Sequence, residues 1–303
     1  MINIERILCP TDLSEDSERT LRYAVALALA YGAKLFVCYR PKSSAEDHEG
    51  VLQTIERLIG AGQSASPAGS AETSTLSWES VLLEDEDLGT CITREAARRG
   101  AQLILMRSRR RPFAAAVLGS TAETVSRLAP CPVLVMHADE REWMDNSTGT
   151  LVLRRILVAY DFSPHSELAL GHALALAQKF QAELHLLHVL PAPVVREPEI
   201  AWVGQDTNAP YHHAARRLQQ AVPAEIHLWS NVKHAVQWGS PYSEVLTYAE
   251  EQEIDLISMG AHGHGYGSYT LFGSNVDRVL RQSPCPLLIA HPLHQTNNQT
   301  STT

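Results

Sequence analysis

The sequence lacks any long apolar run and is short of basic residues. No stretch approaches the roughly 18 consecutive apolar residues that a membrane span needs. Lysine and arginine total 25, against 34 aspartate and glutamate residues, which gives a formal net charge of −9. Proteins that bind nucleic acid or anionic membranes usually carry a basic surface, so we expect neither partner.

Cysteine is scarce and shows no pairing pattern. The five cysteines include no close CxxC pair, and the first residues, MINIERILCP, have neither the basic segment nor the apolar stretch of a signal peptide. We therefore expect a cytoplasmic protein whose thiols pack as small core residues. His212-His213 and His262-Gly263-His264 lack the spacing of known zinc sites and have no cysteine nearby in the sequence, so no metal site is expected.

Three common signatures of nucleotide and acyl chemistry are also missing. The sequence contains no GxxxxGK[ST], which argues against a P-loop NTPase. No GxGxxG follows its first apolar strand, which leaves a dinucleotide-binding fold unsupported. The GxSxG elbow of serine hydrolases is absent as well.

What the sequence has instead is an internal repeat. RILCPTD at 6–12 matches RILVAYD at 155–161, and APCPVLVMH at 129–137 matches SPCPLLIAH at 283–291. Shortly before each later match lies a Gly-Ser pair, in LGS and FGS respectively. The same order of motifs therefore occurs twice, about 150 residues apart, which is the usual size of one domain.

Each repeat predicts one α/β domain. Nearly unbroken apolar strands alternate with helical segments, a pattern typical of a parallel sheet covered on both faces. We place the domains at 1–138 and 151–292 and interpret the polar stretch 138–150 as the linker between them. The segment 60–77, rich in Ser, Ala and Gly, is expected to be a loop, and the polar residues from His294 onward a disordered tail.

Capping residues mark where several helices begin. Ser14 and Ser163 precede the first helix of their respective halves, and Pro164 suits the first helical position. Ser120 and Glu123 have the spacing of a capping box at the start of a later helix.

The second half carries the more complete candidate site. Ligands of open parallel sheets bind beyond the C-terminal strand ends, and Asp161 directly follows the first strand of this half. Nine residues separate Gly260-Ala261-His262-Gly263 from the following Gly273-Ser274. Glycines let backbone N–H groups approach an anion, and a helix N-terminus attracts phosphate. A turn-forming Asp161 and a merely flexible glycine loop explain the same residues, and both alternatives stay open.

The first half has arginines where the second has glycines. MRSRRR at 106–111 precedes Gly119 with a spacing one residue shorter than in the second half, while Asp12 and Ser120 are retained. Both retained residues also suit a turn former or a cap. We expect nucleotide binding to be weakened or lost here, and the arginines either to hold an anion or acidic partner or to form a solvated loop.

The order strand-Asp, Gly-two-Gly-nine-Gly-Ser, Pro-Cys-Pro and strand resembles the universal stress protein family, and the resemblance covers both halves. It implies two tandem doubly wound domains of the adenine nucleotide alpha hydrolase type, each with a five-stranded parallel sheet, packed as a pseudo-dimer. It also implies ATP as the bound cofactor, with Mg²⁺ left open. The residues that it assigns to the nucleotide in the second domain are Ala159, Tyr160, Asp161, Val189, Met259, Gly260, Gly263, Gly273, Ser274 and Asn275.

One departure from the family concerns Tyr160. Many members have Pro-Thr where this sequence has Ala159-Tyr160, and the first half keeps Pro10-Thr11. A tyrosine there either stacks on adenine or crowds the pocket. We expect an ATP-binding stress-response or signalling module without catalytic residues; the alternatives are a slow ATPase and a nucleotide-free interaction protein.

Partner predictions follow from the same resemblance. The apolar strands Val133–Met136 and Leu287–Ala290 each close a domain, and an uncovered apolar edge invites aggregation. We therefore expect the two halves to pair with each other through these strands. A homodimer and an unidentified protein partner are left open.

Overall fold

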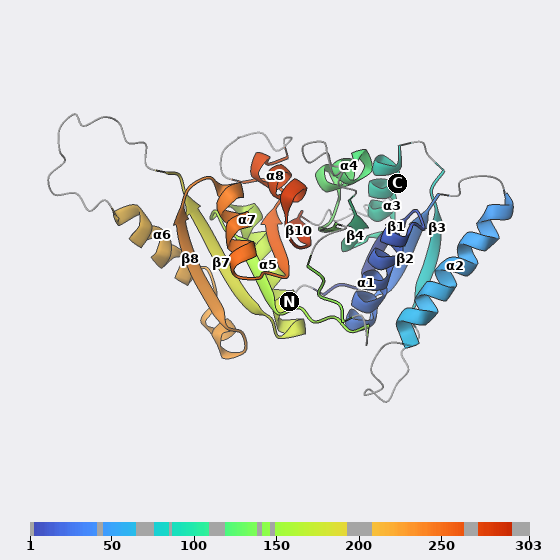
Figure 1. The fold of residues 1–303 in the computed structure, drawn as a ribbon, viewed down its shortest axis with the longest axis horizontal. Coiled ribbons are helices and arrows are strands. Elements are labelled where there is room, and N and C mark those ends of the chain that lie inside the picture. The colour runs from blue at the N-terminus through green and yellow to red at the C-terminus, as the bar shows by residue number, and fades with distance from the viewer. Residues whose placement is uncertain are drawn as a thin grey trace, which may run out of the picture.

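The computed structural model describes residues 3–40, 45–64, 76–84, 87–108, 119–137, 141–145, 149–192, 208–263 and 272–292. Strands and helices alternate along both halves (Figure 1). The first half contains β1 (Arg6–Thr11), α1 (Glu15–Tyr31), β2 (Lys34–Tyr39), α2 (Ala45–Ser64), β3 (Trp78–Leu82), α3 (Leu88–Arg99), β4 (Leu103–Arg107), α4 (Ser120–Leu128) and β5 (Val133–Met136). The second half contains β6 (Arg155–Ala159), α5 (Pro164–Phe180), β7 (Glu183–Leu190), α6 (Ala209–Gln220), the 3-10 helix η1 (Ala224–Leu228), β8 (Val232–Trp238), α7 (Pro241–Glu251), β9 (Leu256–Gly260), α8 (Ser274–Gln282) and β10 (Leu287–Ala290).

A single ten-stranded sheet runs through both halves in the order β3-β2-β1-β4-β5-β10-β9-β6-β7-β8. Neighbouring strands are parallel except β5 and β10, which pair antiparallel with Leu134 opposite Leu288. The predicted fold of two doubly wound five-stranded sheets is confirmed, and so is the pairing of the halves through their last strands.

The strand order places two separate crevices in the molecule. β1 lies between β2 and β4, and β6 lies between β7 and β9, so the connections leave in opposite directions on the two sides of each first strand. Ligands of such sheets bind at this point, beyond the carboxyl ends of the strands. Because β5 and β10 are antiparallel, the strands of the two halves run in opposite directions. The carboxyl ends of the strands in one half therefore lie opposite those of the other half.

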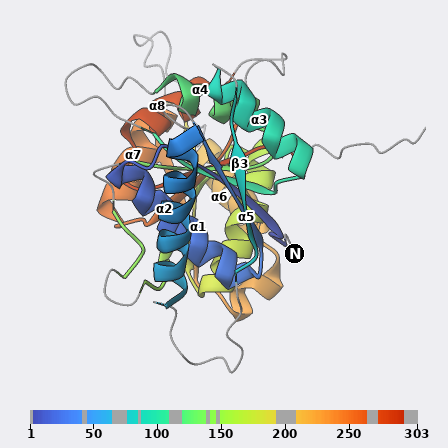
Figure 2. The same ribbon diagram turned by 90° about the vertical axis from the view of Figure 1, so that its right-hand side faces the viewer.

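Helices cover both faces, and each face has one core that crosses the junction of the halves (Figures 1 and 2). Residues of α1, α2, α5 and α6 form the first core, and residues of α3, α4, α7 and α8 form the second. Leu134 and Leu288 belong to the first core, whereas Val133 and Leu287 belong to the second. The halves therefore share their apolar interior. All five cysteines are buried thiols, as predicted.

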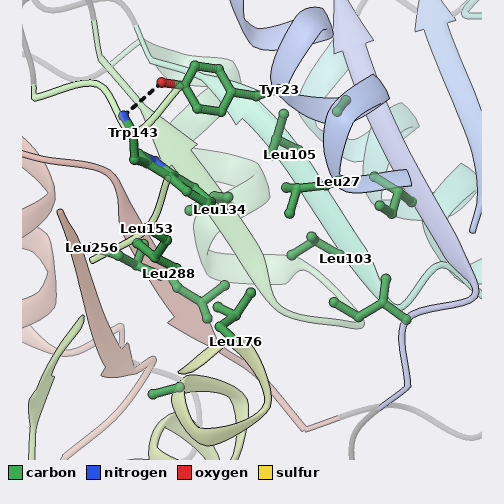
Figure 3. Packing of buried hydrophobic residues seen from close by; sticks show 14 of the residues in the cluster. Tyr23, Leu27, Leu103, Leu105, Leu134, Trp143, Leu153, Leu176, Leu256 and Leu288 are labelled. Carbon is green, nitrogen blue, oxygen red and sulfur yellow. Dashed lines mark hydrogen bonds between the residues drawn. The ribbon is translucent and has the colours of Figure 1, made fainter. Parts of the chain in front are cut away.

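Within the segment 138–150, predicted as the linker between the halves, Trp143 is buried and only 2% exposed. Its indole packs between Tyr23 of α1 and Phe180 of α5, with ring centroids 5.5 and 6.1 Å away, respectively. The backbone N–H of Trp143 donates a hydrogen bond to the Tyr23 hydroxyl over 3.0 Å (Figure 3). The described part of the linker thus completes the first core from a position between the two halves.

The helix caps follow the sequence in two places and depart from it in a third. The side chains of Ser14 and Ser163 accept backbone N–H groups at the starts of α1 and α5, as predicted. The capping box at Ser120 is wrong, because Gly119 is the N-cap and Ser120 is already helical. Glu123 instead pairs with Arg127 at 3.0 Å.

The expected loop at 60–77 begins later than predicted, because α2 continues to Ser64. Residues 65–75 and the predicted tail from His294 lie outside the described residues. In the part of the chain that the structure describes, no helix is long and apolar enough to cross a bilayer.

Buried His172 makes stability depend on pH. It lies on α5 with 8% of its surface exposed, and burial lowers its pKa from the ordinary 6.5 to about 4. Between these values the unfolded chain binds a proton that the folded chain does not. The stabilisation is therefore complete above pH 6.5 and is lost as the pH falls toward 4, by at most about 1.4 kcal/mol per pH unit.

Urea unfolding of wild type and His172→Gln between pH 4.5 and pH 7 tests this contribution. We expect the wild type to lose more of its free energy of unfolding than the variant as the pH falls. Parallel curves for the two proteins would mean that His172 does not titrate as described.

Candidate functional site

The candidate site of the second half begins where β6 turns into α5. Asp161 Oδ1 accepts a hydrogen bond from the backbone N–H of Ser163 over 3.0 Å. Phe162, between them, has a positive φ of 64°, which few residues other than glycine adopt readily. Asp161 therefore shapes the turn through Oδ1, and its second carboxylate oxygen lies toward the glycine segment.

That second oxygen lies beside Gly263. A Cβ atom added to Gly263 would stand 2.8 Å from Asp161 Oδ2. The N–H of Gly273 donates to the carbonyl oxygen of Ala261 over 3.1 Å, which ties the start of α8 to the end of β9. The fold thus brings Asp161, Gly263 and Gly273, far apart in the sequence, to one end of the β6–β9 crevice.

The N-terminus of α8 has no side-chain cap. Gly273 is the N-cap residue and provides no side-chain hydrogen bond, Ser274 is exposed, and Asn275 is partly buried. The first N–H groups of a helix attract anions through their unpaired donors and the helix dipole. The described residues around this end of α8 are therefore suited to an anionic group.

Gly260 is required by packing. An added Cβ would lie 2.6 Å from the carbonyl carbon of His165 and 2.7 Å from its oxygen. The first turn of α5 therefore approaches β9 more closely than any side chain at 260 permits.

The predicted adenine pocket divides between the two faces of the sheet. Ala159, Val189 and Met259 pack against the core formed with α7 and α8. Tyr160 is buried in the opposite core, where its ring stands edge-on to Phe162 with centroids 5.2 Å apart. The Tyr160 ring therefore neither crowds nor extends the surface formed by Ala159, Val189 and Met259.

A pair of histidines flanks the same crevice. The rings of His165 and His262 have centroids 5.0 Å apart. Burial and the neighbouring His262 lower the pKa of His165, against the opposing influence of Asp161. His165 lies at the candidate site and was not identified from the sequence, where its position one turn after Asp161 is the only signal. His264 lies outside the described residues.

The corresponding place in the first half is arranged differently. Asp12 Oδ1 accepts from the N–H of Ser14, from the Ser14 hydroxyl and from the Ser17 hydroxyl. Arg107 occupies the position of Gly260 and pairs with Asp16 of α1 at 3.0 Å. Arg109 to Arg111 lie outside the described residues. Among the residues with described positions, no three His, Cys, Asp or Glu side chains gather as a metal site.

Comparison with known proteins places both halves in one family. The model of the universal stress protein family matches residues 3–137 and 153–291. A universal stress protein of Thermus aquaticus is 32% identical over 145 residues, which are 46% of this chain and 98% of that protein. One of Methanocaldococcus jannaschii is 24% identical over 155 residues, which cover 46% of this chain and 96% of that protein.

A solved structure resembles the whole chain. The crystal structure of a universal stress protein from Archaeoglobus fulgidus superposes with a TM-score of 0.67 and 22% sequence identity. The match covers 97% of this chain and all of that one. At this identity the likeness shows the shared fold.

Proposed function

The chain belongs to the universal stress protein family, and on that premise we propose that its second domain binds ATP in the crevice between β6 and β9. The observation that carries the proposal is the meeting of Asp161 Oδ2 with Gly263 beside the uncapped start of α8. The crevice then offers a carboxylate at one side and free N–H groups at the other.

Each part of the nucleotide has a partner in this arrangement. Ala159, Val189 and Met259 offer an apolar surface to the adenine ring. Met259 and Gly260 would flank the ribose, and Gly263, Gly273, Ser274 and Asn275 would hold the phosphates. The backbone of Tyr160 is bonded within the protein, because its N–H donates to the carbonyl oxygen of Leu187 over 2.8 Å and its own carbonyl oxygen lies 2.8 Å from His188 Nδ1.

We further propose that the protein responds to the nucleotide and does not turn it over. Asp161, the carboxylate of the site, has one oxygen engaged by the N–H of Ser163, and its other oxygen lies beside Gly263. His262 is the described side chain of the glycine segment that could act as a base. A slow ATPase is therefore the second candidate, and it differs from the first only in what happens to bound ATP.

Two measurements test the proposal in sequence. Protein purified without added nucleotide is denatured, and the released small molecules are identified by mass. We expect adenine nucleotide in at most one equivalent per chain. Phosphate release over many turnovers, measured with and without Mg²⁺, then distinguishes a sensor from an enzyme.

Asp161 is expected to select adenine over guanine. Its carboxylate can accept a hydrogen bond from the adenine amino group, whereas guanine presents a carbonyl oxygen there. Two facing acceptors cost on the order of 1–3 kcal/mol. We therefore expect ATP to bind about tenfold or more tightly than GTP.

The matched variants are Asp161→Asn and Asp12→Asn, titrated with both nucleotides. An asparagine at 161 can still accept a hydrogen bond from the N–H of Ser163, but its amide group can donate to the carbonyl oxygen of guanine. The ratio of ATP affinity to GTP affinity should therefore fall. Asp12→Asn should leave both affinities unchanged. If Asp161→Asn weakens ATP binding and discriminates as well as the wild type, Asp161 only shapes the turn.

A further inference from the structure

The first domain contains a cavity of about 680 Å³ at its own crevice, beyond the carboxyl ends of β1 and β4. This volume lies within the range of roughly 300–1,000 Å³ that is usual for small-molecule sites. Residues from β1, β2, β4, α3 and the first turn of α4 line it. Among the described residues, the crevice of this half therefore remains open, although the glycine pattern is lost.

The floor of the cavity is apolar. Cys38, Leu83, Ile92 and Met106 line it, and each is almost completely buried. Burial raises the pKa of the Cys38 thiol, so it stays neutral near pH 7. Such a floor favours a ligand with an apolar, ring-sized body.

The rim carries two arginines where the second domain has uncharged residues. Arg40 and Arg107 both line the cavity, at the positions that Val189 and Gly260 hold in the second domain. The Arg107 guanidinium is fixed by Asp16, with one nitrogen 3.0 Å from the carboxylate and another 3.1 Å from the backbone oxygen. Arg40 is exposed at the mouth. A guanidinium is well suited to carboxylate and phosphate groups.

The start of α4 adds donors on another side of the cavity. Gly119, Ser120 and Thr121 line it, and Gly119 caps the helix without a side-chain hydrogen bond. Asp12 also lines the cavity, and its Oδ1 is oriented toward the start of α1, where it accepts from Ser14 and Ser17. An anionic group between Arg40 and the first turn of α4 therefore meets a favourable field.

We propose that this cavity binds a small organic anion, with an apolar ring-sized body on the floor and one carboxylate or phosphate monoester group at the rim. A triphosphate does not suit the site, because Arg107 fills the position of Gly260 and is already paired with Asp16. The two domains would then hold different ligands, ATP in the second and a small organic anion in the first.

The test uses the full chain and 8-anilinonaphthalene-1-sulfonate, a fluorescent probe with apolar rings and a single anionic group. We expect one saturable site that excess ATP does not displace. Arg40→Gln should weaken probe binding about tenfold, the order expected for one charge-assisted contact. Arg22→Gln removes an exposed arginine of α1 outside the cavity and is the matched control.

Displacement identifies the anionic group. Benzoate and phenyl phosphate share a ring and differ in their head groups, so the stronger competitor shows whether a carboxylate or a phosphate monoester is preferred. Benzyl alcohol, which is neutral, should not compete. Ile92→Trp fills the cavity from the floor and should abolish probe binding without changing ATP affinity.

Three results would overturn the proposal. If Arg40→Gln and Arg22→Gln weaken probe binding equally, or if benzyl alcohol competes as well as benzoate and phenyl phosphate do, the probe binds non-specifically to apolar surface. Displacement by ATP would mean that the probe occupies a nucleotide site. ATP titration of Arg40→Gln is a separate measurement, so failure of ATP binding in the second domain leaves this test intact.

Discussion

Replacing Trp143 by alanine is expected to destabilise the whole chain by about 3–5 kcal/mol, the usual cost of removing a buried tryptophan. The indole is 2% exposed and lies between Tyr23 of the first half and Phe180 of the second. Because each core crosses the β5–β10 junction, both halves should unfold in one transition at a lower temperature. Calorimetry and urea unfolding measure the transition and its free energy.

Two further variants make this result specific. Trp238→Ala makes the same chemical change on the edge strand β8, where the side chain is 36% exposed, and should cost less than half as much. Tyr23→Phe removes the acceptor of the Trp143 N–H and should cost about 1–3 kcal/mol. Similar losses for Trp143→Ala and Trp238→Ala, or two separate transitions, would contradict a shared core sealed by Trp143.

The sequence was sufficient wherever a local pattern decides the structure. Apolar runs predicted the parallel strands, and Ser14 and Ser163 predicted two helix starts through their own backbone contacts. The match between Val133–Met136 and Leu287–Ala290 predicted the junction, because two apolar terminal strands need a cover and each supplies it to the other.

The sequence was insufficient to predict features that depend on contacts between separate helices and strands. Trp143 stands in a polar stretch, and its burial depends on where α1 and α5 meet. Ser120 fits a capping box by spacing, yet Gly119 takes the extended conformation of the N-cap and moves the serine inside the helix. Neither result follows from neighbouring residues alone.

The same distinction applies to the candidate site, where some features could be predicted from the sequence and others required the fold. The glycine spacing indicated an anion site, but the contact between Asp161 and Gly263 required the fold. Adjacent strand residues point to opposite faces, so the separation of Tyr160 from Ala159 could have been predicted from alternation. The need for Gly260 could not, since it depends on how closely α5 approaches β9.

Gly263→Arg is expected to lower the affinity for ATP by about a hundredfold or more, equivalent to about 2.7 kcal/mol. A Cβ at 263 would stand 2.8 Å from Asp161 Oδ2, so the carboxylate or the glycine segment must move. The new guanidinium would then pair with Asp161 and occupy the space between that carboxylate and the start of α8. Titration with a fluorescent ATP analogue measures the loss, and the melting temperature shows that the fold is retained.

Gly119→Arg is the matched control, because Gly119 corresponds to Gly273 in the other half and an added Cβ there meets nothing within 4 Å. It should leave ATP affinity unchanged while blocking the cavity of the first domain. Gly263→Ala separates the two causes, since it introduces the Cβ without the charge and should weaken ATP binding less than arginine does. Equal loss of ATP binding from Gly119→Arg and Gly263→Arg, with both proteins folded, would place the nucleotide outside the β6–β9 crevice and would refute the assignment of the site.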